Sequence, residues 1–281
     1  MDKAEFERAL RDYIGNSPDN CVKPEAALRP DLAGMPIFDE PLMGCASGDD
    51  PYFEEAKKPN IIGPHFMSPG EWLPGARTVV SLFLPFTKQI REANRAAMDW
   101  PADEWLHGRI EGQAFVVSVC RFAEELLQKA GHSALVPALD PRLGRGPSPI
   151  NDKKEQAYHT SNWSERHVAY AAGLGTFGLS AGLITKRGVA GRFASIITDA
   201  AFERDPRPYT GVYDYCSSCY ACAENCPAGA ITKEQGKLHY PCSVFLDATG
   251  KKFAPRYGCG KCQVGVPCED RAPGLDPEVS P

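Results

Sequence analysis

The sequence predicts an α+β protein in two parts: an α/β domain over residues 1–204 and a smaller cysteine-rich domain over residues 205–281. Two observations carry this prediction. The run Thr78–Phe86 is continuously apolar and rich in β-branched residues, which is typical of a strand buried on both faces, and a long amphipathic stretch follows it. Eight of the eleven cysteines lie between Cys216 and Cys268, beyond a proline-rich joint at residues 205–208.

Residues 1–15 place apolar side chains at helical spacing among charged ones, which predicts an amphipathic helix rather than a secretion signal. No apolar stretch approaches the ~20 residues that cross a bilayer. The net charge of −5 gives no general attraction for nucleic acid or an anionic membrane. We therefore expect a cytoplasmic protein without membrane attachment.

Residues 15–75 contain ten prolines, so we expect an irregular wrap over the core without long helices or central strands. Apolar residues at helical spacing predict a helix over residues 104–130. The short run 134–139 predicts a strand, which completes a strand–helix–strand unit with the run at residues 78–86. Residues 140–161 are rich in proline and glycine and predict a loop.

Asn162 and Glu165 have the spacing of a capping box and predict the start of a helix that ends at Gly173. Strands are expected at residues 182–186 and 192–202. The segment Gly173–Gly178 spells GxGxxG, the pattern of dinucleotide-binding loops. That pattern requires a strand before it and a helix after it, and the predicted order here is reversed, so we reject a dinucleotide site.

The cysteine-rich domain opens with a CxxCxxCxxxCP run. This spacing is typical of bacterial iron–sulfur proteins, in which the first three thiolates bind one 4Fe-4S cluster and the fourth binds a neighbouring cluster. The run therefore predicts two clusters. Crossing the ligands as two-cluster ferredoxins do assigns Cys216, Cys219, Cys222 and Cys268 to cluster one, and Cys226, Cys242, Cys259 and Cys262 to cluster two.

Other uses of these cysteines fit less well. A zinc site usually pairs two CxxC motifs across a long loop, whereas four cysteines here lie within eleven residues. Disulfides need an oxidising compartment, and nothing at the N-terminus suggests export. We expect Cys21, Cys45 and Cys120, which lie outside the region, to be ordinary buried thiols.

Taken together, these motifs resemble those of the epoxyqueuosine reductases, which share a corrinoid-binding α/β domain and a two-cluster module with reductive dehalogenases. The resemblance covers about residues 78–268. It is carried by the CxxCxxCxxxCP run, by Cys242, and by the segments Ser164–Gly178 and Gly258–Gln263.

The resemblance implies a nitroreductase-like α/β domain that holds cobalamin with no protein ligand on cobalt, followed by a ferredoxin-like domain whose two clusters supply it with electrons. The glycines of the GxGxxG stretch would let the backbone approach the flat macrocycle, although a helix C-cap and a tight turn explain them comparably well. The cofactor-binding residues expected from the resemblance are Gly173, Leu174, Gly175, Thr176, Phe177 and Gly178.

The catalytic acid differs from that of the family. The resemblance places a proton-donating aspartate six residues before Glu165, and this sequence has His159 there. We expect His159, with Tyr158, to supply the proton, because imidazole titrates near neutrality. The alternative is an ordinary surface histidine.

Two further departures concern the C-terminal part. Five residues separate Cys262 from Cys268, with Pro267 before the second cysteine, where the family has a CxxxCP ending. The sequence ends at Pro281, where longer relatives continue into helical repeats that help to hold tRNA. Together with the acidic net charge, this makes tRNA a doubtful substrate.

We therefore expect an iron–sulfur reductase that takes electrons from a low-potential donor of the ferredoxin or flavodoxin type and reduces a small molecule. The alternative is an electron-transfer protein that docks a redox partner and binds no corrinoid. Four basic residues near the second cluster either raise its potential by offsetting cluster charge or form a solvated face that docks an acidic donor: Lys251, Lys252, Arg256 and Lys261.

Overall fold

A computed structural model of the chain describes residues 1–97, 99–147 and 159–275. Its centre is an antiparallel sheet with the strand order β1-β2-β8-β3. Thr78 of β2 lies opposite Thr198 of β8, and the pairing continues to Pro85 opposite Gly191. The strand predicted from the apolar run is therefore central, and all of its residues are buried. The four strands are β1 (Leu42–Ser47), β2 (Thr78–Pro85), β8 (Gly191–Thr198) and β3 (Ala134–Leu135).

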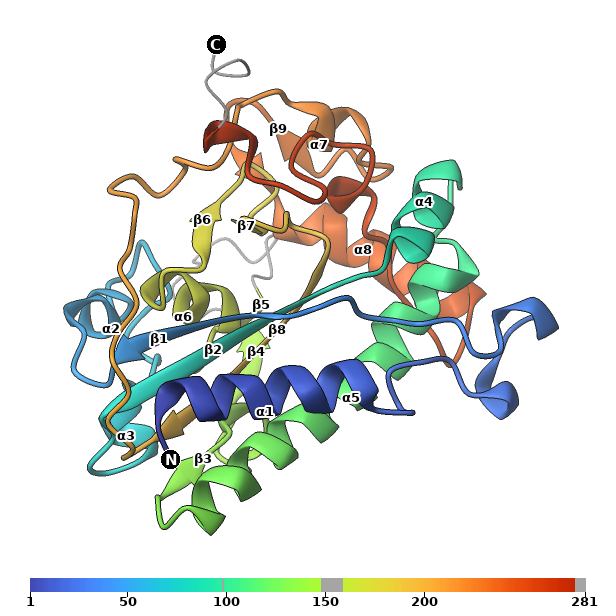
Figure 1. The fold of residues 1–281 in the computed structure, drawn as a ribbon. Helices are drawn as coiled ribbons and strands as arrows, with labels where there is room; N and C mark the ends of the chain where they lie inside the picture. Colours follow the sequence, from blue (N-terminus) through green and yellow to red (C-terminus); the bar gives the residue numbers. More distant parts are fainter. Residues whose placement is uncertain (98, 148–158, 276–281) are drawn as a thin grey trace.

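Helices cover both faces of this sheet, with α1 (Lys3–Asn16) and α5 (Asp103–Lys129) on one face and α6 (Glu165–Ala171) on the other (Figure 1). Val80, Leu82 and Leu84 of β2 pack into the core on the α1 and α5 side. Val79 faces the opposite core, where it meets residues of α6. Because both faces are covered, β2 is apolar at most positions, and its two polar residues, Thr78 and Ser81, are buried as well.

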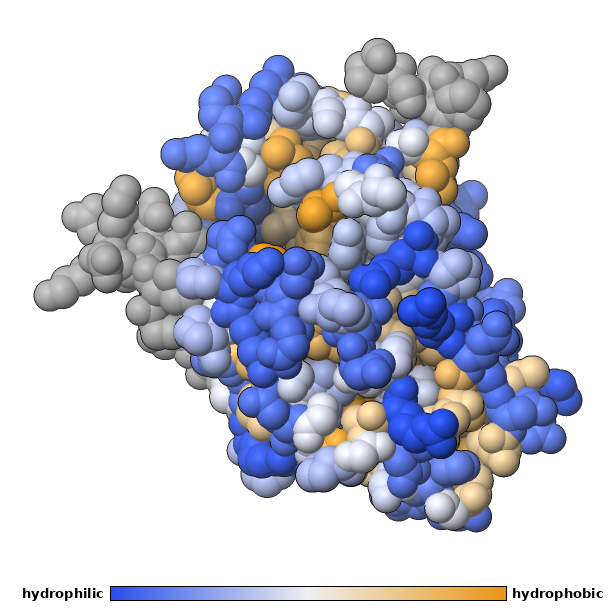
Figure 2. All heavy atoms as spheres, turned by 90° about the vertical axis from the view of Figure 1, so that its left-hand side faces the viewer, coloured by the Kyte–Doolittle hydropathy of each residue, from blue (hydrophilic) through white to orange (hydrophobic). Residues whose placement is uncertain are grey.

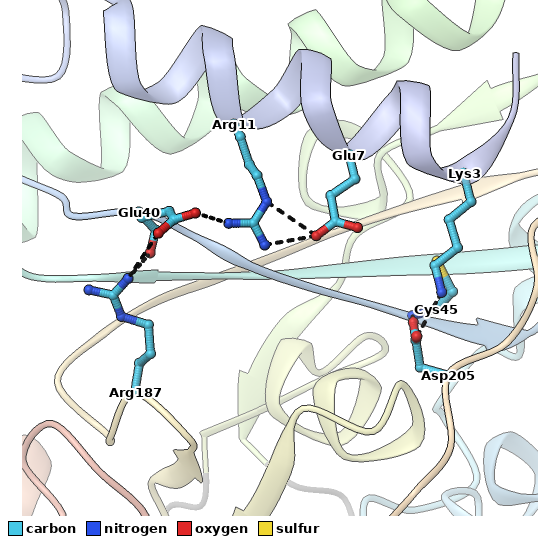
Figure 3. Close-up of polar contacts among 7 residues, drawn as sticks. All are labelled: Lys3, Glu7, Arg11, Glu40, Cys45, Arg187 and Asp205. Atoms are coloured by element: carbon cyan, nitrogen blue, oxygen red, sulfur yellow. Dashed lines mark hydrogen bonds and ion pairs between the residues drawn. The ribbon is translucent and has the colours of Figure 1, made fainter.

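Helix α1 ties the N-terminus to the joint before the cysteine-rich part. Its buried face consists of Phe6, Leu10 and Ile14. On its other side, Lys3 Nζ lies 2.7 Å from Asp205 Oδ1 (Figure 3). Asp205 Oδ2 also accepts a 2.8 Å hydrogen bond from the backbone N–H of Cys45 in β1. One carboxylate therefore connects the helix, the edge strand and the joint.

The predicted helices at residues 1–15 and 104–130 are confirmed as α1 and α5, and the predicted strands at 182–186 and 192–202 as β7 (Leu183–Thr185) and β8. The wrap at residues 15–75 is more regular than expected, since it contributes β1 to the edge of the sheet. Its other elements, and the helix that follows β2, are η1 (Pro24–Ala26), η2 (Pro30–Leu32), α2 (Pro51–Glu55), α3 (Pro69–Trp72) and α4 (Lys88–Ala96).

Three local predictions differ from the structure. The N-cap position of α6 is Ser164, not Asn162, and the Ser164 side chain makes no capping hydrogen bond to the backbone. The Asn162 side chain instead accepts a 2.8 Å hydrogen bond from the N–H of Gly144 and donates a 2.9 Å bond to the carbonyl of Arg142, so it holds a neighbouring loop. The loop expected at residues 140–161 contains the paired strands β4 (Arg145–Pro147) and β5 (His159–Ser161). The predicted strand at 134–139 shortens to β3 and η3 (Pro137–Leu139).

The cysteine-rich part lies above the sheet in Figure 1 and consists of short elements. Figure 2 shows a largely hydrophilic face of the molecule, with a hollow in its upper half around which apolar side chains gather. No helix within the described residues is long and apolar enough to span a membrane. The elements of this part are α7 (Ala221–Glu224), β9 (Ile231–Thr232), β10 (Gly236–Lys237), α8 (His239–Lys252), η4 (Lys261–Gln263) and η5 (Pro273–Leu275).

Candidate functional site

The GxGxxG stretch leaves the end of α6 and enters β6 (Gly175–Phe177). Because a helix precedes it and a strand follows, the rejection of a dinucleotide fingerprint is confirmed. Gly173 has a left-handed backbone with φ of +80°, and a Cβ there would lie 2.6 Å from the carbonyl oxygen of Pro206. A Cβ on Gly175 would lie 1.9 Å from the carbonyl oxygen of Ile184. Both glycines are thus required by close approaches of the protein's own backbone.

The same stretch seats the beginning of the cysteine-rich part. Thr176 Oγ1 accepts a 2.8 Å hydrogen bond from the N–H of Tyr215, the residue before Cys216. The N–H of Phe177 donates to the carbonyl of Val212 at 2.8 Å. The β6–β7 hairpin therefore holds the entry to the cysteine run. The expected corrinoid contacts of these residues remain a prediction.

The predicted acid lies at the edge of the described residues. His159 is the first residue of β5 and pairs with Pro147, whereas Tyr158 lies outside the described residues. The catalytic role of both remains a prediction. Sequence reasoning overlooked a second imidazole beside β5: His65 Nε2 lies 2.9 Å from Thr160 Oγ1. His65 lies in the proline-rich wrap, where no motif distinguishes it.

The loops that carry the cysteines have an unusual backbone. Ser218 directly precedes Cys219 and Tyr220 directly follows it, and their φ values are +52° and +61°. Gly260, in the later CxxC pair, has φ of +69°. Left-handed residues in such loops turn successive N–H groups toward one concave side, an arrangement found at many iron–sulfur sites. The loops therefore have a shape that suits an anionic cluster.

The thiols within electrostatic reach of one another form two sets. Burial raises the pKa of Cys268 to about 12, and charges on Cys216, Cys222 and Cys219 act in the same direction. Burial likewise raises the pKa of Cys259 to about 12, and charges on Cys262 and Cys242 add to it. The pKa of Cys262 is raised by burial and by Cys242 and Cys226, against the opposing effect of Lys237.

These sets coincide with the ligand groups that the sequence assigns to clusters one and two, although the coordination itself remains a prediction. The two sets are adjacent. Burial is the main cause of the raised pKa of Cys222, and the charge of Cys262, from the other set, adds to it. Burial raises the pKa of four of these thiols, and such groups fit a site in which iron compensates thiolate charge: Cys222, Cys259, Cys262 and Cys268. In the part of the chain that the structure describes, no three His, Cys, Asp or Glu side chains converge on a single metal ion.

A cavity of about 170 Å³ lies between the second cysteine set and side chains of β8 and α5. Cys226, Cys242, Cys259 and Cys262 all line it, and the facing wall contains Phe86, Trp105, Arg109 and Arg192. The cavity therefore joins the second proposed cluster to side chains of β8 and α5.

The facing wall is cationic. Arg109 donates a 2.8 Å hydrogen bond to the hydroxyl of Tyr257, and Arg192 donates to Gln113. No described carboxylate forms a salt bridge with either guanidinium. Burial lowers the pKa of Arg192 to about 10, and repulsion from Arg109 acts in the same direction. An anionic group in the cavity would relieve this repulsion.

The four basic residues near the second set have different environments. Lys251 and Lys252 are exposed, and Lys252 Nζ lies 4.6 Å from the centre of the Trp100 ring. Arg256 is mostly buried and pairs with Glu111, and Lys261 is 5% exposed. Burial lowers the pKa of Lys261 to about 8, against the attraction of Cys259 and Asp99. A solvated docking face can therefore include only the first two.

Cys45 and Cys120 are buried, as expected of ordinary core thiols, and burial raises the pKa of Cys45 to about 12. The same expectation is wrong for Cys21, which is half-buried and donates a 3.1 Å hydrogen bond from its thiol to the carbonyl of Pro18.

Comparison with known proteins supports the iron–sulfur interpretation. The family pattern described as "4Fe-4S binding domain" matches residues 209–232, which contain the first four cysteines of the run. The epoxyqueuosine reductase of Bacillus subtilis (strain 168) is 26% identical over 258 residues, which cover 87% of this chain and 58% of that protein. The chain thus spans little more than half the length of this relative. A tetrachloroethene reductive dehalogenase of Desulfitobacterium hafniense is 39% identical over 110 residues, or 37% of this chain and 20% of that protein.

The fold is similar to solved structures of epoxyqueuosine reductases. A crystal structure of one with an epoxyqueuosine-modified tRNA-Tyr stem loop superimposes with a TM-score of 0.53 at 18% identity, covering 99% of this chain and 69% of that one. The structure of the Streptococcus thermophilus epoxyqueuosine reductase gives a TM-score of 0.50 at 16% identity, covering 95% of this chain and 66% of that one. The predicted resemblance is thus confirmed over most of the chain, as is a mixed helix-and-sheet fold with a 4Fe-4S binding domain toward the C-terminus.

Proposed function

We propose that this chain is a cytoplasmic iron–sulfur reductase, in which two 4Fe-4S clusters pass electrons to a cofactor in the α/β domain for the reduction of a small molecule. The observation that carries the proposal is the arrangement of eight cysteines in two adjacent sets, the second of which faces the α/β domain across a cavity. When bound, the clusters would supply one-electron transfer. The division into residues 1–204 and 205–281, and the nitroreductase-like character of the first, belong to the same proposal.

The chain's own residues orient and shield this site. Hairpin β6–β7 fixes the entry to the cysteine run through the Thr176–Tyr215 hydrogen bond. Phe86 and Trp105 form an apolar wall of the cavity, which limits access of water to the second cysteine set. Arg109 and Arg192 on the same wall suit a substrate or cofactor with an anionic group.

Cobalamin is our candidate for the cofactor, and it rests on the family resemblance. The 170 Å³ cavity is too small to enclose a whole corrinoid, and the close contacts of Gly173 and Gly175 are with the protein itself. Reconstituting the clusters anaerobically and titrating cobalamin tests this part of the proposal. A shift in the corrinoid absorption spectrum with saturable binding is expected, and its absence would favour an electron carrier that docks a redox partner.

The clusters are tested by Cys222→Ala, which removes a proposed ligand of cluster one. We expect the loss or degradation of one cluster, measured as iron and sulfide content and by the spectrum of the reduced protein. Cys120→Ala is the matched control, because this thiol is buried in α5 away from the run, and it should keep both clusters. Retention of two complete clusters in Cys222→Ala would refute the ligand assignment.

The proton donor is tested by His159→Gln. We expect slower turnover on an identified substrate with both clusters intact, because the amide cannot deliver a proton. His65→Gln is the comparison that shows whether the neighbouring imidazole has this role instead. Unchanged turnover in His159→Gln would reject the assignment to His159.

The solved relative with the tRNA stem loop raises the question of a tRNA substrate. The net charge of −5 argues against this for the present chain, and we propose a small molecule and an external donor of the ferredoxin or flavodoxin type. A salt-dependent binding measurement with a tRNA anticodon stem loop would distinguish the two. Tight binding at physiological salt would overturn the small-molecule proposal.

A further inference from the structure

Lys261 lies between two proposed ligands of the second cluster, Cys259 and Cys262, and its side chain turns into the protein. Its Nζ donates hydrogen bonds to the backbone carbonyl of Asn94 at 2.6 Å, to Asn94 Oδ1 at 2.9 Å, and to the carbonyl of Ala97. An ammonium group has three N–H donors, and all three are used here. Each partner is an oxygen that accepts.

This arrangement requires the charged form of the side chain. A neutral amine would direct a lone pair at one of the three oxygens, none of which can donate to it. The two backbone carbonyls belong to the last turn of α4 and to the residue that caps it, where carbonyls lack partners within the helix and carry partial negative charge. Lys261 therefore supplies hydrogen-bond donors to the carbonyls at the C-terminal end of α4.

No carboxylate neutralises this charge directly. Among the described residues, Lys261 forms no salt bridge, and Asp99 interacts with it only through space. Asn94 is fully buried, and its Nδ2 donates a 3.0 Å hydrogen bond to the carbonyl of Cys259. The acceptor that holds the ammonium group therefore also holds the loop that presents the cysteine.

We propose that Lys261 is a fixed positive charge that raises the reduction potential of the second cluster above the value that the cysteines and the loop alone would give. The inference depends on the proposed assignment of Cys259 and Cys262 to that cluster. On reduction the cluster gains one electron from the external donor, and no bond forms or breaks in the protein. A neighbouring positive charge stabilises the product of this step more than the starting state, because the product is more negative.

The position of the charge separates Lys261 from the other basic residues nearby. Arg256 is paired with Glu111, which offsets its charge. Lys251 and Lys252 are exposed, so water and salt screen them. Lys261 is buried beside the cysteines, where screening is weaker.

The experiment compares the wild-type protein with Lys261→Gln, Lys261→Met and Lys261→Arg after anaerobic reconstitution. Each is titrated with dithionite and redox mediators, and the electron paramagnetic resonance signals of the reduced clusters give the two midpoint potentials. Cys242→Ala identifies the signal of the second cluster. We expect a negative shift of that potential in the Gln and Met variants, little change in the Arg variant, and no shift of the first cluster.

Lys252→Gln is the matched control, because it removes an exposed cation from the same part of the chain, and it should shift neither potential appreciably. The Gln variant retains two amide donors for the carbonyls of Asn94, which favours correct folding. Unchanged potentials in both neutral variants, with both clusters present, would overturn this inference and leave the proposed function standing. Loss of the second cluster in both neutral variants would overturn it too, since Lys261 would then act on assembly. Absence of clusters from the wild type would instead refute the proposed function.

Discussion

The sheet-containing body and the cysteine-rich part use different means to hold their shape. Helix α1 buries three large apolar residues against the sheet, and all eight residues of β2 are buried. Helix α8 is as long as α1, with 14 residues, but it buries only Thr249. Helix α7 buries no residue. The body has enough apolar contact to fold by hydrophobic burial, whereas we expect the cysteine-rich part to obtain much of its stability from the proposed thiolate–metal bonds.

Removal of iron should separate the two regions most clearly. We expect chelation under anaerobic conditions to increase amide hydrogen exchange throughout residues 209–275, while β2 and β8 keep their protection. Hydrogen exchange with mass spectrometry, with and without iron, measures both regions in one sample. Equal protection of residues 209–275 in the two states would contradict the comparison.

Shortening a buried side chain in the sheet-containing body should lower stability whether or not iron is bound. Leu82 is fully buried, with 0% of its surface accessible to solvent, and it packs into the core on the α1 and α5 side of the sheet. Leu82→Ala should lower the free energy of unfolding by about 2–5 kcal/mol, with or without iron, because it leaves a cavity beneath α1 and α5. Denaturant unfolding followed by circular dichroism measures the change. Leu28→Ala, at a position 43% exposed, is the control and should change stability by less than about 0.5 kcal/mol.

Gly260→Ala should damage the second CxxC loop. A Cβ at this position would lie 1.9 Å from Trp105 Cζ2, and φ is +69°. Left-handed strain and overpacking together should cost about 2–4 kcal/mol and weaken retention of the second cluster. Gly229→Ala separates the two causes, because Gly229 also has positive φ but no atom within 4 Å of a Cβ. Equal losses in the two variants, measured by iron content and melting temperature, would rule out the contact with Trp105.

The smallest effect is expected at the link between the two regions. Lys3→Met removes the ion pair with Asp205, whose partners are partly exposed, so the stability should fall by only about 0.5–1 kcal/mol. Raising the salt concentration should reduce the difference from wild type. Lys58→Met, at a more exposed ion pair, is the control for loss of a surface charge. A loss above about 2 kcal/mol would show that the link supports the cysteine-rich part as a whole.

The sequence predicted those elements in which a single structural requirement determines the pattern of residues. The run at β2 is apolar at most positions because helices cover both its faces, and α5 has apolar residues at helical spacing. The spacing of the cysteines likewise predicts two ligand sets, because cluster ligation needs a fixed ligand number and spacing, and the coordination itself stays a prediction. Both signals lie within a short segment of sequence.

What the sequence did not reveal depends on contacts between distant segments. Asn162 has the spacing of a cap, but its amide meets residues 142 and 144 in the folded chain, and α6 starts after Ser164. Lys261 was one of four candidate cations, and only the position of Asn94, 167 residues earlier, distinguishes it. Strand β1 was missed because an edge strand in a proline-rich segment has no long apolar run.

The position of β8 has a consequence for how the chain is made. This strand lies between β2 and β3, although both precede it in the sequence. During synthesis, β2 and β3 must therefore wait with open backbone edges until residues 191–198 leave the ribosome, and pairing over such sequence separations is slow. The cysteine run begins at Cys216, beyond the end of β8 at Thr198, so the nascent protein can close its sheet before the proposed iron ligands are complete.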